Sequence, residues 1–406
     1  MEGPISMFPD TPLVMVEDND LLSEVAEHLN NCAVIGVDTE SDSFYSYQER
    51  VCLLQISDLE RDYVIDPLKV TDLSPLAKVF ASEDTVKILH GADYDIVCLK
   101  RDFGHEFAAV FDTLFGAQFL GLPKIGLGDL IRHYFGIDLE KAYQRHNWSL
   151  RPLQPEHIDY ARGDTHWLMA IRELMMRELA SLDRLRHVEE ECKLVVQREW
   201  QGRVFDPEGY QRMKGAAGMS DEELRVLRQL YLYRDGYAKK RNRPSFKVLA
   251  DPLLVKIARA QPASSGALAK MLSSKSSVGR RHGDALLDCV QKGLADDSAI
   301  GVPKKKGTPK GNPKQPEGAT KVRLHGRAAE RVHQGLKTWR NQLVSSDPNL
   351  TPFMVASNGT LKKIAACCPA DLDELANVPD VRTWQVADHG EAILKTLEAL
   401  CKDEKL

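Results

Sequence analysis

Two acidic residues, Asp38 and Glu40, stand two positions apart at the end of the apolar run AVIGVDTE. Residues two apart on a β-strand project from the same face, so both carboxylates would point to one place. Like charges held together cost free energy unless a cation compensates them, and hard oxygen ligands suit Mg²⁺ or Mn²⁺. The pair is therefore a candidate metal site, although most isolated motifs of this kind are solvated strand ends.

Two further constellations occur later in the chain. Tyr160 and Asp164 are four positions apart in HIDYARGDTHWLMAIREL, and positions i and i+4 share one face of a helix. In HGADYD at 90–95, an apolar strand ends and a helix begins close to Asp95. Singly, Tyr160 could be a half-buried aromatic residue and Asp95 a helix cap. The three constellations together favour one acidic site.

The elements that must position these side chains lie in the first 200 residues. Short β-rich apolar runs cover 33–37, 51–56, 63–65 and 86–89, with helical segments such as 73–81 and 95–101 between them. From residue 127 to about residue 200 the pattern is mostly helical. Strands with helices between and after them predict an α/β domain with a mixed sheet, which we place at residues 1–210.

The motifs, in this order, resemble ribonuclease D and its nuclear exosome-associated relatives, members of the DEDD superfamily of 3′→5′ exonucleases. The resemblance is carried by VDTE at 37–40, LLQI at 53–56, HGADYD at 90–95, FDT at 111–113, KAYQRHNWSLRPL at 141–153 and YARGD at 160–164. It implies a ribonuclease H-like mixed sheet flanked by helices. It also implies a catalytic set in which four carboxylates bind metal and a tyrosine marks the DEDDy branch: Asp38, Glu40, Asp95, Tyr160 and Asp164.

The same resemblance implies two Mg²⁺ or Mn²⁺ ions that clamp the scissile phosphodiester. Asp38 would bridge them, Glu40 and Asp164 would bind the nucleophile-side ion, and Asp95 would act mainly through the second ion's water shell. A tyrosine pKa of about 10 makes Tyr160 a poor general base at neutral pH, so we expect it to orient the attacking water. The expected reaction releases nucleoside 5′-monophosphates from RNA 3′ ends, as in the maturation of tRNA precursors or other small stable RNAs.

Other residues are weaker candidates. Gln144, Trp148 and Arg151 precede the catalytic helix and could contact the terminal nucleotides, or they could form a structural loop in which Trp148 packs on the domain. We expect His90 to be a hydrogen-bonded histidine at a strand end. Asp112, at a strand-to-helix junction, is expected to cap the helix or to support the metal ligands from outside.

Charge is distributed unevenly along the 406 residues, whose net charge is −5. Residues 232–323 contain 20 Lys or Arg against 7 Asp or Glu, so this segment carries +13 and the remainder about −18. A basic segment predicts attraction to a polyanion, most plausibly nucleic acid, although a solvated lysine-rich surface is the alternative. Candidates for contact with an RNA backbone are Lys239, Lys240, Arg241, Arg243 and the cluster 304–306.

The second half of the chain predicts two small helical domains joined by a linker. The stretch GVPKKKGTPKGNPKQPEG at 301–318 is too polar to form a core, so we assign a flexible cationic linker to 298–323. The flanking segments 215–297 and 324–406 have helical periodicity, and each resembles an HRDC domain, the first through RNRPSFKVLA and the second through PFMVAS. No phosphate-binding G-x-x-x-x-G-K-[ST] loop occurs, so we expect neither a helicase nor a nucleotide cofactor.

Composition excludes several classes of protein. Apolar residues at 43% and charged residues at 28% indicate a globular chain, and no apolar run approaches the roughly 20 residues that cross a bilayer. Without a secretory signal at its start, the chain is expected in the cytoplasm, with no membrane partner. Eight dispersed cysteines suggest reduced thiols rather than disulfides or a zinc site, and the lack of a heptad seam suggests a monomer.

Two other functions remain open from the residues alone. A DNA 3′→5′ exonuclease could use the same carboxylates, because discrimination depends on contacts to the 2′-OH that no motif here displays. A non-catalytic nucleic-acid-binding scaffold is the more distant alternative, and the complete set of five catalytic residues argues against it.

Overall fold

The computed structural model describes residues 11–139, 142–200, 202, 205–272, 278–300 and 320–403. Its N-terminal part, the α/β unit, contains a six-stranded mixed sheet in the order β1-β4-β3-β2-β5-β6. The strands are β1 (Leu13–Val16), β2 (Val34–Ser41), β3 (Val51–Ser57), β4 (Asp62–Ile65), β5 (Val86–Leu89) and β6 (Val110–Asp112). Strand β2 is antiparallel to β3 and parallel to β5. The mixed sheet confirms the predicted fold class, and the parallel edge strand β1 is an addition to it.

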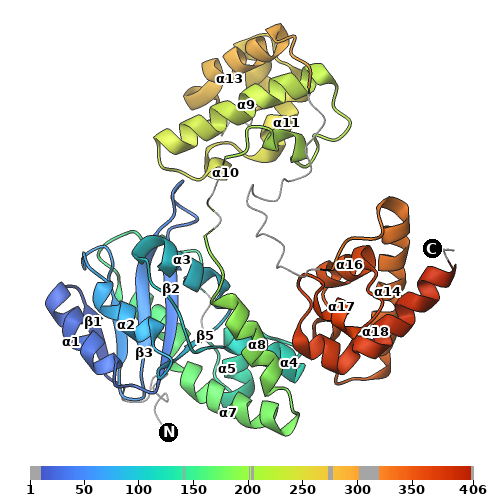
Figure 1. Cartoon of the computed structure of the whole chain (residues 1–406). Coiled ribbons are helices and arrows are strands. Elements are labelled where there is room, and N and C mark those ends of the chain that lie inside the picture. Colours follow the sequence, from blue (N-terminus) through green and yellow to red (C-terminus); the bar gives the residue numbers. More distant parts are fainter. Residues whose placement is uncertain are drawn as a thin grey trace.

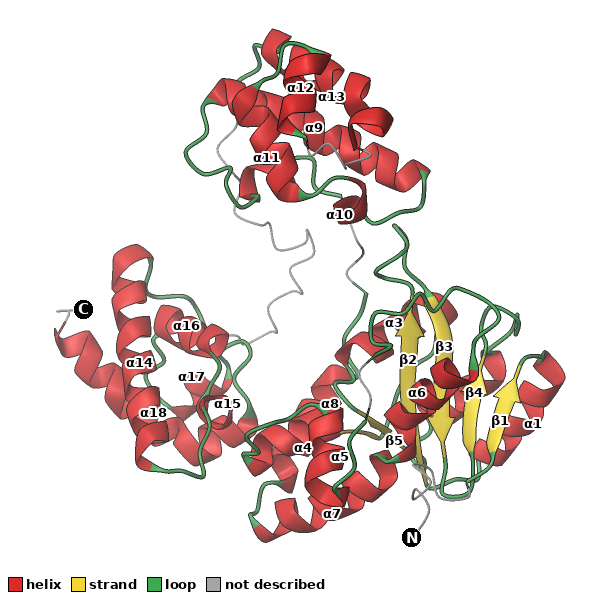
Figure 2. Ribbon diagram, turned by 180° about the vertical axis from the view of Figure 1, so that it is seen from behind, coloured by secondary structure: helices red, strands yellow, loops and turns green. Residues whose placement is uncertain are grey.

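Helices cover both faces of the sheet (Figures 1 and 2). One face carries α1 (Asn19–Leu29), the short turn η1 (Ser74–Leu76), α2 (Ala77–Ala81) and α3 (Asp93–Phe103), over a core that includes Ile35 and Phe80. The other face carries α6 (Pro155–His166), which packs on β2, β3 and β4, and α7 (Leu168–Ser181). Helices α4 (Thr113–Leu120), α5 (Leu127–Phe135) and α8 (Leu185–Val195) complete the unit. Every residue of β3 is buried, as expected for a strand covered on both faces.

The first helical unit comprises α9 (Asp221–Lys240), α10 (Ser245–Val248), α11 (Asp251–Ala260), α12 (Ser265–Met271) and α13 (Val278–Ala295), preceded by the turn η2 (Gly209–Arg212). Helix α9 begins with a capping box, in which Ser220 and Glu223 each accept the other's backbone N–H with a side-chain oxygen. Tyr210 and Met213 belong to the core of this unit. The packed unit therefore extends upstream of the predicted boundary at residue 215.

The second helical unit comprises α14 (Gly326–Ser346), α15 (Pro352–Val355), α16 (Asn358–Cys367), α17 (Leu372–Ala376) and α18 (Thr383–Asp403). The backbone N–H of Thr320 donates to the Asn377 carbonyl at 3.0 Å, and that of Arg323 donates to Ala366 at 2.9 Å. These contacts extend the unit upstream of residue 324. The lysine cluster 304–306 of the predicted linker lies outside the described residues.

Both helical units contact the α/β unit. Phe119 on α4 packs edge-on against Trp384 of the second unit, with ring centroids 5.3 Å apart, and His187 on α8 lies 2.6 Å from Asp388. On the first unit, Asp235 accepts a hydrogen bond from the Tyr47 hydroxyl at 2.9 Å. Figure 1 accordingly shows the second unit beside α4 and the first unit beyond the end of β2. All eight cysteines are free thiols, as predicted.

Among the described helices, none combines the length and the apolar character that a bilayer crossing requires.

Candidate active site

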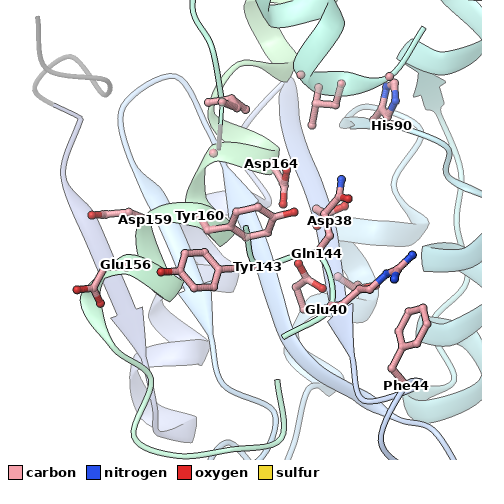
Figure 3. Close-up of a pocket in the computed structure, with 17 residues that line it drawn as sticks. Asp38, Glu40, Phe44, His90, Tyr143, Gln144, Glu156, Asp159, Tyr160 and Asp164 are labelled. Atoms are coloured by element: carbon pink, nitrogen blue, oxygen red, sulfur yellow. The ribbon is translucent and has the colours of Figure 1, made fainter. Parts of the chain in front are cut away.

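Three carboxylates meet where helix α6 crosses strand β2. Asp38 and Glu40 project from one face of β2, and Asp164 projects from α6 onto the same point (Figure 3). One oxygen from each of the three side chains lies within 4.8 Å of the other two. The structure therefore brings together the pair that strand spacing predicted and the acid of the helical motif.

The close approach of α6 depends on Gly36 in β2. A β-carbon at this position would lie only 2.9 Å from the Thr165 carbonyl oxygen, a distance that carbon and oxygen do not tolerate without bonding. Because residue 36 is glycine, the α6 backbone can contact β2 at Thr165, the residue that follows Asp164.

Helix α6 is also held by Asp62 on β4, which is buried beneath it. Arg162 forms an ion pair with Asp62, and His166 lies 2.9 Å from the same carboxylate. The Ser57 hydroxyl donates to Asp62 at 2.6 Å. Arg162 and His166 flank Asp164 on the helix, so these contacts fix the rotation of α6 that points Asp164 toward Asp38.

Asp95 reaches the site from the opposite face of the sheet. It accepts a hydrogen bond of 2.5 Å from Thr39, the residue between the two acidic positions of β2. The turn that leads into α3 is held by Asp112, whose carboxylate accepts the backbone N–H groups of Gly91 and Ala92, each at 2.8 Å. Asp112 also accepts the Leu114 N–H and so caps α4, the supporting role expected from the sequence.

A cavity of about 750 Å³ opens in front of the carboxylates. Its lining includes Asp38, Glu40 and Asp164, with Tyr160, Gln144 and His90 around them. Figure 3 shows the Tyr160 ring with its hydroxyl directed toward Asp38 and Asp164. The cavity thus presents an acidic cluster and one phenol to whatever enters it.

Burial and mutual repulsion disfavour ionisation of the cluster. Burial raises the pKa of Glu40 to about 9, with Asp164 and Asp95 adding to the effect. Burial likewise raises the pKa of Asp164 to about 7 and holds that of Asp38 well above its usual range. Burial and the three nearby carboxylates also raise the pKa of Tyr160, which therefore stays protonated at neutral pH. Paired carboxylates of this kind become stable as anions only when a cation joins them.

The three residues ahead of the catalytic helix separate into two groups. Gln144 lines the cavity, consistent with the expected contact to substrate. Trp148 is only 1% exposed and packs in the core with Leu53 and Ala161, so it is a packing residue. Arg151 donates to both Asp66 oxygens at 2.6 and 2.7 Å, which commits its guanidinium to a structural ion pair. The expectation that Trp148 and Arg151 touch substrate is therefore corrected.

The basic residues proposed for backbone contact lie at the end of α9 and in the loop after it. Lys239, Lys240, Arg241 and Arg243 are all exposed. Close to them, the Lys247 ammonium lies 3.5 Å from the centre of the Tyr45 ring, on the loop that leads from β2 past the cavity. The structure leaves these cations available to a polyanion on the side of the first helical unit that faces the α/β unit.

His90 lies in the cavity wall with a defined partner. Its Nδ1 is 3.0 Å from the Thr113 hydroxyl, which in turn lies 3.0 Å from the Leu89 carbonyl oxygen. Burial lowers the pKa of His90 to about 4, which keeps the imidazole neutral. His90 is thus a hydrogen-bonded histidine at a strand end, as expected.

Sequence reasoning missed two aromatic residues of the cavity. Phe44 is 45% exposed on its rim, with the Arg145 guanidinium 5.9 Å from its ring centre. Tyr143 packs edge-on against Tyr160, with ring centroids 5.9 Å apart. Their only sequence signal was the presence of aromatic residues among polar ones in FYSY and KAYQR, which does not distinguish a cavity rim from a core.

Comparison with protein families agrees with this architecture. A family described as 3′-5′ exonuclease matches residues 13–180, and the HRDC domain family matches residues 223–290 and 329–397. The first match contains the whole carboxylate cluster, and the other two fall on the first and second helical units.

Individual relatives extend the comparison. Protein RRP6-like 2 of Arabidopsis thaliana is 30% identical over 311 residues, which cover 73% of this chain and 36% of that protein. The chain thus spans about a third of that relative's length. Escherichia coli RNase D, known from its crystal structure, is 24% identical in sequence. The match covers 97% of this chain and 99% of the RNase D chain, with a TM-score of 0.67, so the two share a fold.

The catalytic core of RRP6 from Trypanosoma brucei is 30% identical, with a TM-score of 0.65 over 71% of this chain and 81% of the solved one. This identity extends across most of the solved core, and the exonuclease match in this chain is followed by two HRDC matches. The chain therefore belongs to the RNase D and RRP6 family of 3′→5′ exonucleases that carry HRDC domains.

Proposed function

We propose that this chain is a divalent-metal-dependent 3′→5′ exoribonuclease. The observation that carries the proposal is the convergence of Asp38, Glu40 and Asp164 within 4.8 Å of one another, in a cavity that also receives Tyr160. A cluster built only to stabilise the fold would not place three like charges together without a buried base among them.

The donor set suits a hard divalent cation. Asp38, Glu40 and Asp164 offer carboxylate oxygens alone, the ligands preferred by Mg²⁺ and Mn²⁺. Such a cation would offset the repulsion that raises the carboxyl pKa values, neutralise charge on the scissile phosphate and acidify the attacking water. Asp95, held by Thr39 just behind the strand, would support the site from the other face.

The chain's own residues would position the reactants. Tyr160, protonated at neutral pH, is suited to donate a hydrogen bond that orients the water rather than to remove its proton. Attack on the terminal phosphodiester forms a new P–O bond and breaks the bond from phosphorus to the 3′ oxygen. The products are a nucleoside 5′-monophosphate and an RNA shortened by one residue, with a free 3′-OH.

An RNA substrate with structure is the further part of the proposal. Escherichia coli RNase D, which shares the fold, is described as an exoribonuclease involved in structured RNA processing. The exposed cations Lys239, Lys240, Arg241 and Arg243 offer a sequence-independent grip on a backbone. We therefore propose tRNA precursors or similar small stable RNAs as substrates, gripped by the first helical unit while the 3′ end enters the cavity.

Digestion of matched RNA and DNA oligonucleotides tests the proposal. Each would carry a 5′ label and be incubated with Mg²⁺, with Mn²⁺ or with chelator, and the products would be resolved over time. We expect one-residue shortening of RNA from its 3′ end with either metal and no reaction with chelator. Equal digestion of RNA and DNA would make the chain a general 3′→5′ exonuclease. No shortening of either oligonucleotide with Mg²⁺ or Mn²⁺ would overturn the proposal.

A further inference from the structure

A second group of metal-ligating side chains lies away from the active site, where the end of α1 meets the turn between β3 and β4. His28 and Cys32 are four positions apart on and just after α1, and Asp58 follows β3. His28 Nε2 is 2.6 Å from Asp58 Oδ2, and the Cys32 Sγ is 3.8 Å from Nε2 and 4.0 Å from Oδ2. The three ligand atoms thus lie within 4.8 Å of one another.

We propose that His28, Cys32 and Asp58 form a Zn²⁺ site. Imidazole nitrogen, thiolate sulfur and carboxylate oxygen are the three ligand types of protein zinc sites, with metal–ligand distances of about 2.0–2.3 Å. Tetrahedral ligands at those distances lie about 3.3–3.6 Å from one another. The two distances to sulfur are near this range. A bound ion would require the distance between His28 Nε2 and Asp58 Oδ2 to increase by less than about an ångström. Since the His28 side chain is 37% exposed, a water molecule can complete the coordination.

The carboxylate is held in place for this role. Asp58 is only 4% exposed, and its Oδ1 accepts the backbone N–H groups of Glu60 and Arg61, each at 2.7 Å. The buried Tyr63 hydroxyl donates to Oδ2 at 3.1 Å. These three bonds occupy three of the roughly four lone-pair sites of the carboxylate and leave one, on Oδ2, for His28 or for a metal ion. Hydrogen bonds of this kind orient metal ligands and tune their affinity.

The thiol distinguishes a metal site from a simple ion pair. His28 and Asp58 would satisfy each other without a third partner, whereas Cys32 adds a sulfur ligand that an ion pair does not use. Cysteine spacing alone gave no indication of zinc because the other two ligands are not cysteines. The catalytic cluster, built from oxygen alone, favours harder cations, so the two sites would take different metals. Binding would release the Cys32 thiol proton to solvent, and occupancy would rise with pH.

Co²⁺ serves as a spectroscopic probe of this site because a cobalt–thiolate bond absorbs by charge transfer, which carboxylates cannot reproduce. The full chain would be freed of metal, supplied with excess Mg²⁺ for the active site, and titrated with Co²⁺ and then Zn²⁺. We expect a thiolate band that saturates at one equivalent and is displaced by Zn²⁺. The band should be lost in Cys32→Ser and retained in Asp164→Asn.

Matched variants exclude other thiols. Cys368 and Cys401 have sulfur atoms 3.1 Å apart in the second helical unit, so the variant with both changed to Ser controls for metal capture there and should keep the band. Tyr63→Phe keeps all three ligands and should weaken Zn²⁺ binding by about 10–100-fold. On the unmodified chain, Zn²⁺ should slow alkylation of Cys32, measured by peptide mass. A band that survives in Cys32→Ser, or Cys32 alkylation unaffected by Zn²⁺, would overturn the proposal.

Discussion

Gly36 of β2 faces the carbonyl oxygen of Thr165 on α6 so closely that a β-carbon on the strand would lie 2.9 Å from that oxygen. This contact sets the distance between the strand that carries Asp38 and the helix that carries Asp164. The metal-binding capacity of the site therefore depends on a residue that has no functional group.

Gly36→Ala should destabilise the fold by about 1–3 kcal/mol, the usual cost of forcing an extra methyl group into a packed interior. The helix must move away from β2 to accommodate it, so Mg²⁺ or Mn²⁺ should also bind more weakly. Chemical denaturation and metal titration measure the two effects. Gly236→Ala, where an added β-carbon on α9 meets no atom within 4 Å, is the matched control and should leave both quantities unchanged or raise stability slightly.

Asp62→Ala should cost about 3–5 kcal/mol of unfolding free energy, because it leaves the buried Arg162 guanidinium without its counter-ion. Urea denaturation of the two proteins gives the difference. Glu173→Ala removes the partner of Arg177 in an exposed pair on α7 and should cost no more than about 0.5 kcal/mol. Equal losses in the two variants would mean that Asp62 does not anchor α6.

Stability of the metal-free protein should fall as pH rises through the titration of the cluster. The folded-state pKa values of Glu40 and Asp164 are raised to about 9 and about 7, so the folded state binds more protons than the unfolded chain. The contribution of these groups to the free energy of unfolding is therefore fully present below about pH 4 and is lost as the pH rises toward 9.

Asp164→Asn isolates this effect because it removes one of the titrating charges with little change in shape. In chelator, the variant should gain stability over the unsubstituted protein, and the gain should increase between pH 5 and pH 9. Addition of Mg²⁺ or Mn²⁺ should reverse the order, since only the unsubstituted protein keeps all its ligands. A stability difference that does not vary with pH would contradict the pKa values assigned to the cluster.

The double variant Lys239→Ala/Lys240→Ala should bind structured RNA more weakly and with a shallower salt dependence. Each lost phosphate contact reduces the slope of log K against log salt by about 0.7 on a single strand and by about 0.9 on a duplex. Lys362→Ala/Lys395→Ala removes two exposed lysines from the second helical unit and is the matched control. Similar slopes for the two variants would show that α9 has no special part in RNA binding.

Much of the site was predictable because its signals are local. Strand alternation placed Asp38 and Glu40 on one face, and helical spacing placed Tyr160 beside Asp164. The sequence could not decide between substrate contact and a structural loop for Arg151 and Trp148, because their partners Asp66 and Leu53 are distant in sequence and only tertiary packing reveals them. The same limit applies to Trp384, whose aromatic contact with Phe119 joins the second helical unit to the α/β unit.

The most direct test of the central claim compares the unsubstituted chain with Asp164→Asn on one 5′-labelled RNA in the presence of Mg²⁺. Products would be resolved at single-nucleotide spacing, and circular dichroism would show that the variant is folded. We predict a ladder that shortens from the 3′ end, with release of nucleoside 5′-monophosphates, for the unsubstituted chain, and intact RNA for Asp164→Asn. The same ladder at the same rate from both proteins would contradict catalysis by the carboxylate cluster.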